Sequence, residues 1–201
     1  MIQDKSKLPI QILVSHEWEK NCDEIVPVRQ DKRWIGIRDL IKKVTNDVEK
    51  RLKDRPGEKT LEIQIKRLRG QHGQFILNAL IDRIDQGDIL IVDIGGERYG
   101  SYNPNVLIEL GIALGMGKLH SENLFILKPV GLNWPSDLQG ILYTEYELEK
   151  NTLKLKDSIG FHAALRGCLI NTARQKNMIG SSKKPLISIE GFDEATEDTN
   201  Y

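Results

Sequence analysis

The stretch DILIVDIGGERYGSYNPNVLIELGIALGMGK, residues 88–118, decides the fold. It begins with a short apolar run, DILIVDI (88–94), which is typical of a strand buried on both faces of a sheet. Asn103 and Pro104 then indicate a helix start, because Asn can cap free backbone amides and Pro fits the first helical position. A buried strand followed by a helix is the repeating unit of a parallel α/β sheet.

The same alternation extends in both directions from this stretch. Strands are predicted at residues 10–14, 61–68, 88–94, 123–128 and 140–144. Helices are predicted at residues 37–53, 75–84 and 159–178, and a further helix starts at Asn103 and Pro104 and contains Glu109. Apolar and polar residues alternate through 61–68, which favours a half-exposed edge strand. We therefore expect an α/β three-layer sandwich with a five-stranded parallel sheet in the order 2-1-3-4-5. Residues 1–180 form this domain, and residues 181–201 are expected to form a mobile acidic tail.

Composition and charge exclude several classes of protein. The chain has 201 residues, with 29 Lys plus Arg and 29 Asp plus Glu, and this balance argues against a dedicated nucleic-acid binder. Cys22 and Cys168 lie far apart and indicate reduced thiols, and the four histidines show no metal-ligand spacing. No signal-peptide core or bilayer-length apolar run is present, so we expect a cytoplasmic protein without a membrane partner.

Glu109 is the main candidate for chemistry. It is the only charged residue in VLIELGIALG, residues 106–115, and it falls in the second turn of the predicted helix. Burial should raise the pKa of its carboxyl, and the helix dipole should oppose that rise more weakly. A carboxylate in a partly dry pocket can stabilise the oxocarbenium-like transition state of glycosidic cleavage. The alternative is a structural ion pair between Glu109 and a Lys or Arg at the edge of the sheet.

Ligands of parallel α/β sheets bind beyond the carboxyl ends of the strands, which selects further candidates. Asp93 ends a buried strand and either binds a ribose hydroxyl or caps the following turn. Ser15 and His16 end the first strand, where His16 either contacts a phosphate or base or is polar surface. Asn105 precedes Glu109 by one helical turn and shares its face. Trp134 either stacks on a base or nicotinamide or packs over the sheet.

The motifs DILIVDIGG, NPNVLIELGIALGMGK, LFILKPV and WPSDLQGILY, in this order between residues 88 and 143, resemble the TIR-like predicted nucleotide-binding domains of bacterial anti-phage systems. They are similar, more distantly, to the nucleoside 2-deoxyribosyltransferases. Both groups are flavodoxin-like sheets with an x-E-[LI]-G helix whose glutamate is catalytic, and the resemblance implies this role for Glu109 alone. Residues 16–36 match no pattern of either group. Tyr102 and Asn103 stand where the transferases usually place an acid, which weighs against deoxyribosyl transfer.

The residues and the resemblance together predict an N-glycosidase that cleaves a ribosyl–base bond of a nucleotide. NAD is the favoured substrate, because nicotinamide leaves from a cationic pyridinium and needs no general acid. We expect no cofactor and no metal. The alternatives are a nucleoside or nucleotide 2-deoxyribosyl hydrolase or transferase, and a nucleotide-sensing or assembly module without turnover. The resemblance also implies a role in antiviral defence or signalling, through a homo-oligomer or a partner-activated assembly.

Overall fold

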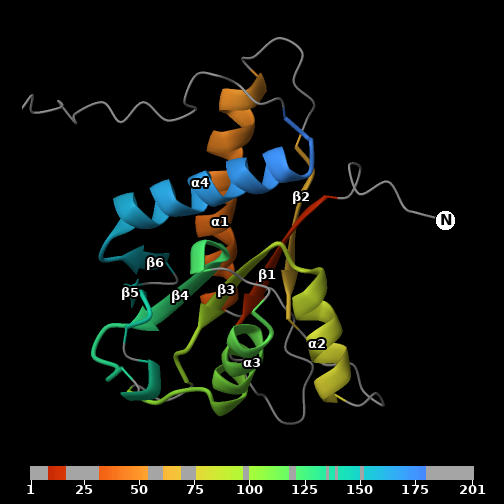
Figure 1. The fold of residues 1–201 in the computed structure, drawn as a ribbon. Coiled ribbons are helices and arrows are strands. Elements are labelled where there is room, and N and C mark those ends of the chain that lie inside the picture. The colour runs from red at the N-terminus through yellow and green to blue at the C-terminus, as the bar shows by residue number, and fades with distance from the viewer. Residues whose placement is uncertain are drawn as a thin grey trace, which may run out of the picture.

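A computed structural model describes residues 9–16, 32–53, 61–68, 76–96, 100–117, 121–134, 136–138, 140–149 and 152–179 (Figure 1). They contain a six-stranded sheet in the order β2-β1-β3-β4-β5-β6. Its strands are β1 (Ile10–Ser15), β2 (Ile63–Arg67), β3 (Ile89–Asp93), β4 (Leu124–Pro129), β5 (Thr144–Glu149) and β6 (Thr152–Leu155). The first five pair in parallel, and β6 runs antiparallel to β5. The expected tail at residues 181–201 lies outside the described residues.

The predicted strand order 2-1-3-4-5 is confirmed, and two details at one edge differ. The fifth strand was predicted at residues 140–144 but is Thr144–Glu149, and the sixth strand was not predicted. The apolar run GILY satisfied the sequence rule for a strand better than TEYELE does. In β5 only Tyr146 is buried, since β5 and β6 form a short hairpin at the edge, where few apolar residues are needed.

Helices cover both faces of the sheet. They are α1 (Lys32–Lys53), α2 (Ile76–Gln86), α3 (Pro104–Gly115) and α4 (Ser158–Gln175), with short 3-10 turns η3 (Ser121–Asn123) and η4 (Ser136–Leu138). One core lies between the sheet and the pair α1 and α4, and the other lies between the sheet and the pair α2 and α3 (Figure 1). Helix α1 begins five residues before the predicted start at residue 37 and includes the buried Trp34. No helix in the described ranges is both long and apolar enough to cross a bilayer.

The chain direction switches between β1 and β3, two strands in the middle of the sheet. Strand β1 pairs with β2 on one side and with β3 on the other. The chain therefore crosses from β1 to β2 on one side of β1, and then from β2 to β3 on the other side of β1. Ser15 at the end of β1 is aligned with Val92 of β3. In parallel sheets such a point opens a crevice at the carboxyl ends of the strands. The ends of β1, β3 and β4 therefore define where a ligand site is expected.

The close approach of α1 to β6 gives a test of the packing. A Cβ atom added to Gly36 of α1 would lie 2.9 Å from the Cβ of Leu153, whereas one added to Gly167 of α4 would meet no atom within 4 Å. We expect Gly36→Ala to lower the free energy of unfolding by about 1–2 kcal/mol through overpacking. Gly167→Ala should raise it by about 0.5–1 kcal/mol through helix propensity. Denaturant unfolding measures both, and equal stability of the two variants would contradict this packing.

Candidate active site at the ends of β1 and β3

The start of α3 positions the candidate catalytic residue. Asn103 has extended backbone angles, φ −89° and ψ 113°, and its Oδ1 accepts hydrogen bonds from the amides of Asn105 (2.9 Å) and Val106 (3.2 Å). Pro104 occupies the first helical turn, as the sequence predicted. The Asn103 amide also donates to the Ile94 carbonyl at 3.2 Å. The start of the helix is therefore held directly against the end of β3.

Glu109 reaches from α3 to the end of β1. The Ser15 hydroxyl donates a hydrogen bond to Oε2 of Glu109, joining two residues that are 94 positions apart in the sequence. Ser15 is fully buried and Glu109 is half-buried. Val106 and Leu110, which lie beside Glu109 on α3, belong to the core beneath the helix. The carboxylate is therefore held at the switch point by a serine that the sheet itself positions.

The environment of Glu109 favours its neutral form more than water does. Burial raises the pKa of the Glu109 carboxyl, and the hydrogen bond from Ser15 opposes part of that rise. Within the described ranges, Glu109 forms no ion pair with a Lys or Arg, so the alternative of a structural ion pair finds no support there. A poorly solvated carboxylate without a resident cation is suited to stabilising a cation that forms on a ligand.

Asp93 points to the opposite face of the sheet from Ser15. Its neighbours Ile89 and Ile91 belong to the core under α1 and α4, whereas Leu90 and Val92 belong to the core under α3. Oδ1 of Asp93 accepts hydrogen bonds from the Tyr146 hydroxyl (2.8 Å) and the Gly95 amide (3.1 Å). The bond to Gly95 caps the turn after β3, which is one of the two roles expected for Asp93. A ribose contact by Asp93 stays a prediction.

Arg33 at the start of α1 is a residue that the sequence did not indicate. Its two terminal nitrogens donate to the carbonyls of Gly95 (2.8 Å) and Gly96 (2.6 Å), and Nη1 lies 4.0 Å from Oδ2 of Asp93. The Gly95–Gly96 turn has no room for side chains, because an added Cβ would lie 2.5 Å from Pro129 or Ser101. Arg33 therefore fixes the turn that leads into α3, from a stretch that matched no motif.

His16 is buried rather than part of a polar surface. Its ring stacks on Trp34 of α1 with 5.7 Å between the ring centroids and 17° between the planes. The guanidinium of Arg67, at the end of β2, lies 4.3 Å from the centroid of Trp34 on the same side of the sheet as α1. His16 and Asp93 thus belong to the α1 face. A contact of His16 with a phosphate or base stays a prediction.

Trp134 is packed in the loop after β4. Its ring stacks on Tyr143 at a centroid distance of 4.4 Å, and its indole N–H donates to the Leu138 carbonyl at 2.6 Å. The Tyr102 hydroxyl donates to the Asn133 carbonyl at 2.6 Å and joins this loop to the one before α3. Packing, the alternative for Trp134, is thus observed, and stacking on a ligand stays a prediction.

Asn105 lies on α3 four residues before Glu109, and it is exposed.

The candidate residues therefore form two groups at the carboxyl ends of β1 and β3, one on each face of the sheet. Ser15 and Glu109 are in contact on the α3 face, and His16 and Asp93 lie on the α1 face with Arg33. In the described ranges, no cluster of His, Cys, Asp and Glu could hold a metal ion. Residues 17–31 and 97–99, which adjoin these strand ends in the sequence, lie outside the described residues, so the crevice at Glu109 stays a prediction.

The cysteines offer no second reactive centre in the described ranges. Cys168 is a buried free thiol in α4, and burial raises its pKa to about 12, so that it stays protonated at neutral pH. Its sulfur lies 3.4 Å from Oδ1 of Asn123. A thiol of this kind is a poor nucleophile. The free thiol of Cys168 agrees with the reduced state expected from the sequence. Cys22 lies outside the described residues.

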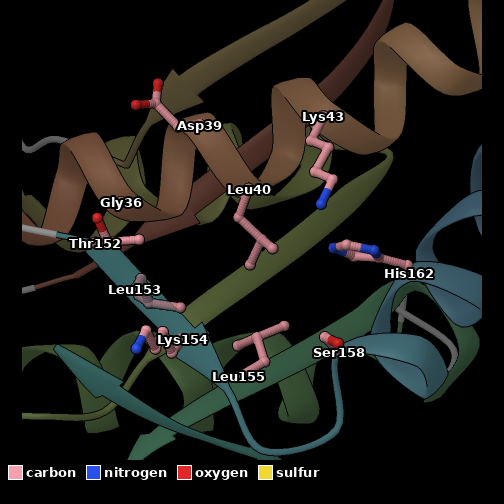
Figure 2. A pocket seen from close by; sticks show the side chains of 10 residues that line it. All are labelled: Gly36, Asp39, Leu40, Lys43, Thr152, Leu153, Lys154, Leu155, Ser158 and His162. Carbon is pink, nitrogen blue, oxygen red and sulfur yellow. The ribbon is translucent and has the colours of Figure 1, made fainter. Parts of the chain in front are cut away.

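A cavity of about 450 Å³ lies away from Glu109, between α1, β6 and the start of α4 (Figure 2). None of the predicted site residues lines it. It belongs to the face of the sheet that α1 and α4 cover, whereas Ser15 and Glu109 meet on the other face. The molecule thus has a candidate catalytic pair and a separate hollow.

Comparison with known proteins places residues 42–148, just over half of the chain, in the family model described as CAP12/Pycsar effector protein, TIR domain. The matched residues include Asp93, Asn105, Glu109 and Trp134 but not Ser15 or His16. The match supports the TIR-like part of the resemblance and does not extend to the deoxyribosyltransferases.

Two further comparisons add little. A search of curated proteins finds no significant match. The crystal structure of the Francisella novicida lysine decarboxylase LdcF aligns with a TM-score of 0.31 and 11% identity, covering 83% of this chain and 18% of that one. This chain therefore spans less than a fifth of the decarboxylase. A likeness at this level indicates nothing about function.

Proposed function

This chain belongs to the TIR-domain family of CAP12/Pycsar effector proteins, and we propose that it is an N-glycosidase that cleaves the ribosyl–base bond of a nucleotide, NAD above all. One observation carries the proposal. The Glu109 carboxylate is half-buried at the switch point of the sheet and bonded to Ser15, and it has no ion-pair partner among the described residues. An α/β sheet binds its ligand at this place, and a carboxylate there can stabilise positive charge on the sugar.

The chemistry of the leaving group favours NAD. Nicotinamide departs from a cationic pyridinium as a neutral molecule, so its departure requires no proton donor. A purine or pyrimidine leaves poorly unless it is protonated, which requires a general acid as well. Asp93, the second candidate acid, already has its carboxylate bonded to Tyr146 and Gly95 on the other face. A single carboxylate can suffice for the departure of nicotinamide, whereas the departure of a purine or pyrimidine also calls for a general acid.

Activity of this kind would deplete a nucleotide, which fits a role in antiviral defence. The direct test is to incubate the purified protein with NAD and separately with deoxynucleosides, and to quantify the released base by chromatography. We expect nicotinamide from NAD and no base from deoxynucleosides. Because TIR-like enzymes often require assembly, the assay is repeated at high protein concentration and with crowding agents. Base released only from deoxynucleosides would support the deoxyribosyl reaction instead.

Ser15 provides a pH test of the proposed carboxylate. Glu109 must be ionised to stabilise a cation, so kcat/KM should fall as the pH drops through the raised pKa of Glu109. The hydrogen bond from Ser15 holds that pKa down, so Ser15→Ala should move the acidic limb of the profile to higher pH. A lower plateau without any movement of the limb would show that Ser15 acts on something other than Glu109.

A further inference from the structure

The cavity between α1, β6 and the start of α4 has the size of a small-molecule site. Its volume of about 450 Å³ lies within the roughly 300–1,000 Å³ of typical ligand pockets. Leu40, Leu153 and Leu155 line it from α1 and β6, and in Figure 2 their side chains lie across its centre. An apolar surface of this kind suits a flat apolar group of a ligand. The cavity needs neither Ser15 nor Glu109, so it is independent of the proposed glycosidase site.

Two nitrogen-bearing side chains meet at one end of the cavity. Lys43 from α1 and His162 from α4 point toward each other in Figure 2, and Ser158 lies below them at the start of α4. Nε2 of His162 is buried and has no hydrogen-bond partner within the described ranges. Asp157, beside Ser158, uses its carboxylate to cap the Gly160 amide at 2.8 Å. Three potential donors, from Lys43, His162 and Ser158, therefore lie at one end of the cavity, beside the leucines at its centre.

The other charged groups of the lining are already paired. Lys154 forms an ion pair with Glu149, and Asp39 forms one with Arg38 at 3.1 Å. Lys43 forms no ion pair with any described residue. A small anion would give the Lys43 ammonium a partner without displacing an existing one. Lys43 itself is exposed, so its attraction alone would be weak and needs the neighbouring donors.

The groups around His162 show the same excess of positive charge. Burial, Lys43 and Arg166 all lower the pKa of His162, and only Asp47 opposes them. Asp47 is itself paired with Arg166 at 2.7 Å and with Arg51 at 3.3 Å. An anion bound between Lys43 and His162 would reverse this balance, because it favours the protonated ring.

From this arrangement we propose that the cavity binds a small molecule that carries a phosphate on a flat apolar ring. The phosphate lies between Lys43, His162 and Ser158, whose donors match a tetrahedral group with several oxygens. The ring lies on Leu40, Leu153 and Leu155. Occupation of the cavity would join the helices α1 and α4 to the edge strand β6 of the sheet that they cover.

The test uses three probes on the full chain. 1-Naphthyl phosphate carries both the ring and the phosphate, 1-naphthol carries the ring alone, and inorganic phosphate carries the charge alone. Calorimetry should show naphthyl phosphate binding at least about 10-fold more tightly than either of the others. The NMR signals of the His162 ring, assigned through their loss in His162→Gln, should report a raised pKa when naphthyl phosphate is saturating. Equal binding of naphthyl phosphate and inorganic phosphate would overturn the proposal.

Matched variants separate this cavity from other anion sites. Lys43→Met keeps the apolar stem and removes the charge, and it should weaken binding of naphthyl phosphate about 10-fold or more. Lys42→Met is the control, because Lys42 is a neighbour on α1 that is also exposed but does not line the cavity. Glu109→Gln should bind the probe as the parent does. Loss of binding in Glu109→Gln, or equal effects of the two lysine variants, would place the probe elsewhere and refute the assignment.

Discussion

Glu109→Gln is expected to reduce base release from NAD about 100-fold or more, because removing a comparable electrostatic stabiliser costs roughly 2.7–4 kcal/mol of barrier. The amide has nearly the same volume as the carboxylate and can still accept the hydrogen bond from Ser15. It carries no charge, however, and cannot stabilise a cationic sugar carbon. Binding of the nucleotide should survive, so the loss should appear in kcat and much less in KM.

The fold should tolerate this change, which makes the loss of turnover interpretable. Burial raises the pKa of Glu109 in the folded protein, so this carboxyl lowers the stability of the fold as the pH rises from its ordinary pKa of 4.5 through the raised value. Glu109→Gln should therefore melt at the same temperature as the parent or higher at neutral pH. The difference should shrink as the pH falls from the raised pKa towards 4.5, where the carboxyl of the parent is protonated in the folded and the unfolded chain alike. A lower melting temperature at neutral pH would contradict this account of the site.

A matched control is Glu122→Gln. Glu122 is an exposed residue of η3, directly before the amino end of β4. It therefore lies at the opposite end of the strands from Glu109, which contacts Ser15 at the carboxyl end of β1. Its replacement removes the same charge and should leave base release within about twofold of the parent, because surface charges far from a site contribute little. Full turnover in Glu109→Gln would show that Glu109 is not the catalytic residue. A parent that releases no base from any nucleotide under assembled conditions would instead favour the nucleotide-sensing or assembly module.

The order of the sheet was predictable because buried parallel strands leave a strong signal. Residues 89–92 are entirely apolar, and the helix start at Asn103 and Pro104 follows from local chemistry that the structure retains. The hairpin of β5 and β6 was less visible, since β5 carries three glutamates and each of its two strands buries only one side chain. Edge strands need few buried residues, so their sequences resemble those of loops.

The candidate site was predictable in its location and less so in its contacts. The switch-point rule placed Ser15, Asp93 and Glu109 at one end of the strands, but only Ser15 and Glu109 touch. Asp93 follows Val92, and successive residues of a strand point to opposite faces, so its side chain meets Tyr146 and Arg33 instead. Arg33 was not predicted because it binds backbone carbonyls more than 60 positions away. Every residue has a backbone carbonyl, so such a contact requires no particular residue type that a sequence could reveal.

Arg33→Met is expected to lower the free energy of unfolding by about 2–4 kcal/mol. The side chain of Asp93 is 0% exposed and that of Arg33 is 22% exposed, so the pair is largely shielded from water. Met retains much of the apolar stem of Arg33 and removes both the charge opposite Asp93 and the two donors to Gly95 and Gly96. Denaturant unfolding measures the loss directly.

The control for Arg33→Met is Arg38→Met, on the same helix. Arg38 pairs with Asp39, and their side chains are 37% and 58% exposed, so its loss should cost less than about 1 kcal/mol. The role of Arg33 toward Asp93 is tested by a double-mutant cycle with Asp93→Asn, which keeps an acceptor for Tyr146 and Gly95. If Arg33 neutralises the buried carboxylate, its removal should cost at least about 1 kcal/mol less in the Asn background. Additive effects would show that Arg33 does not stabilise the fold through the charge of Asp93.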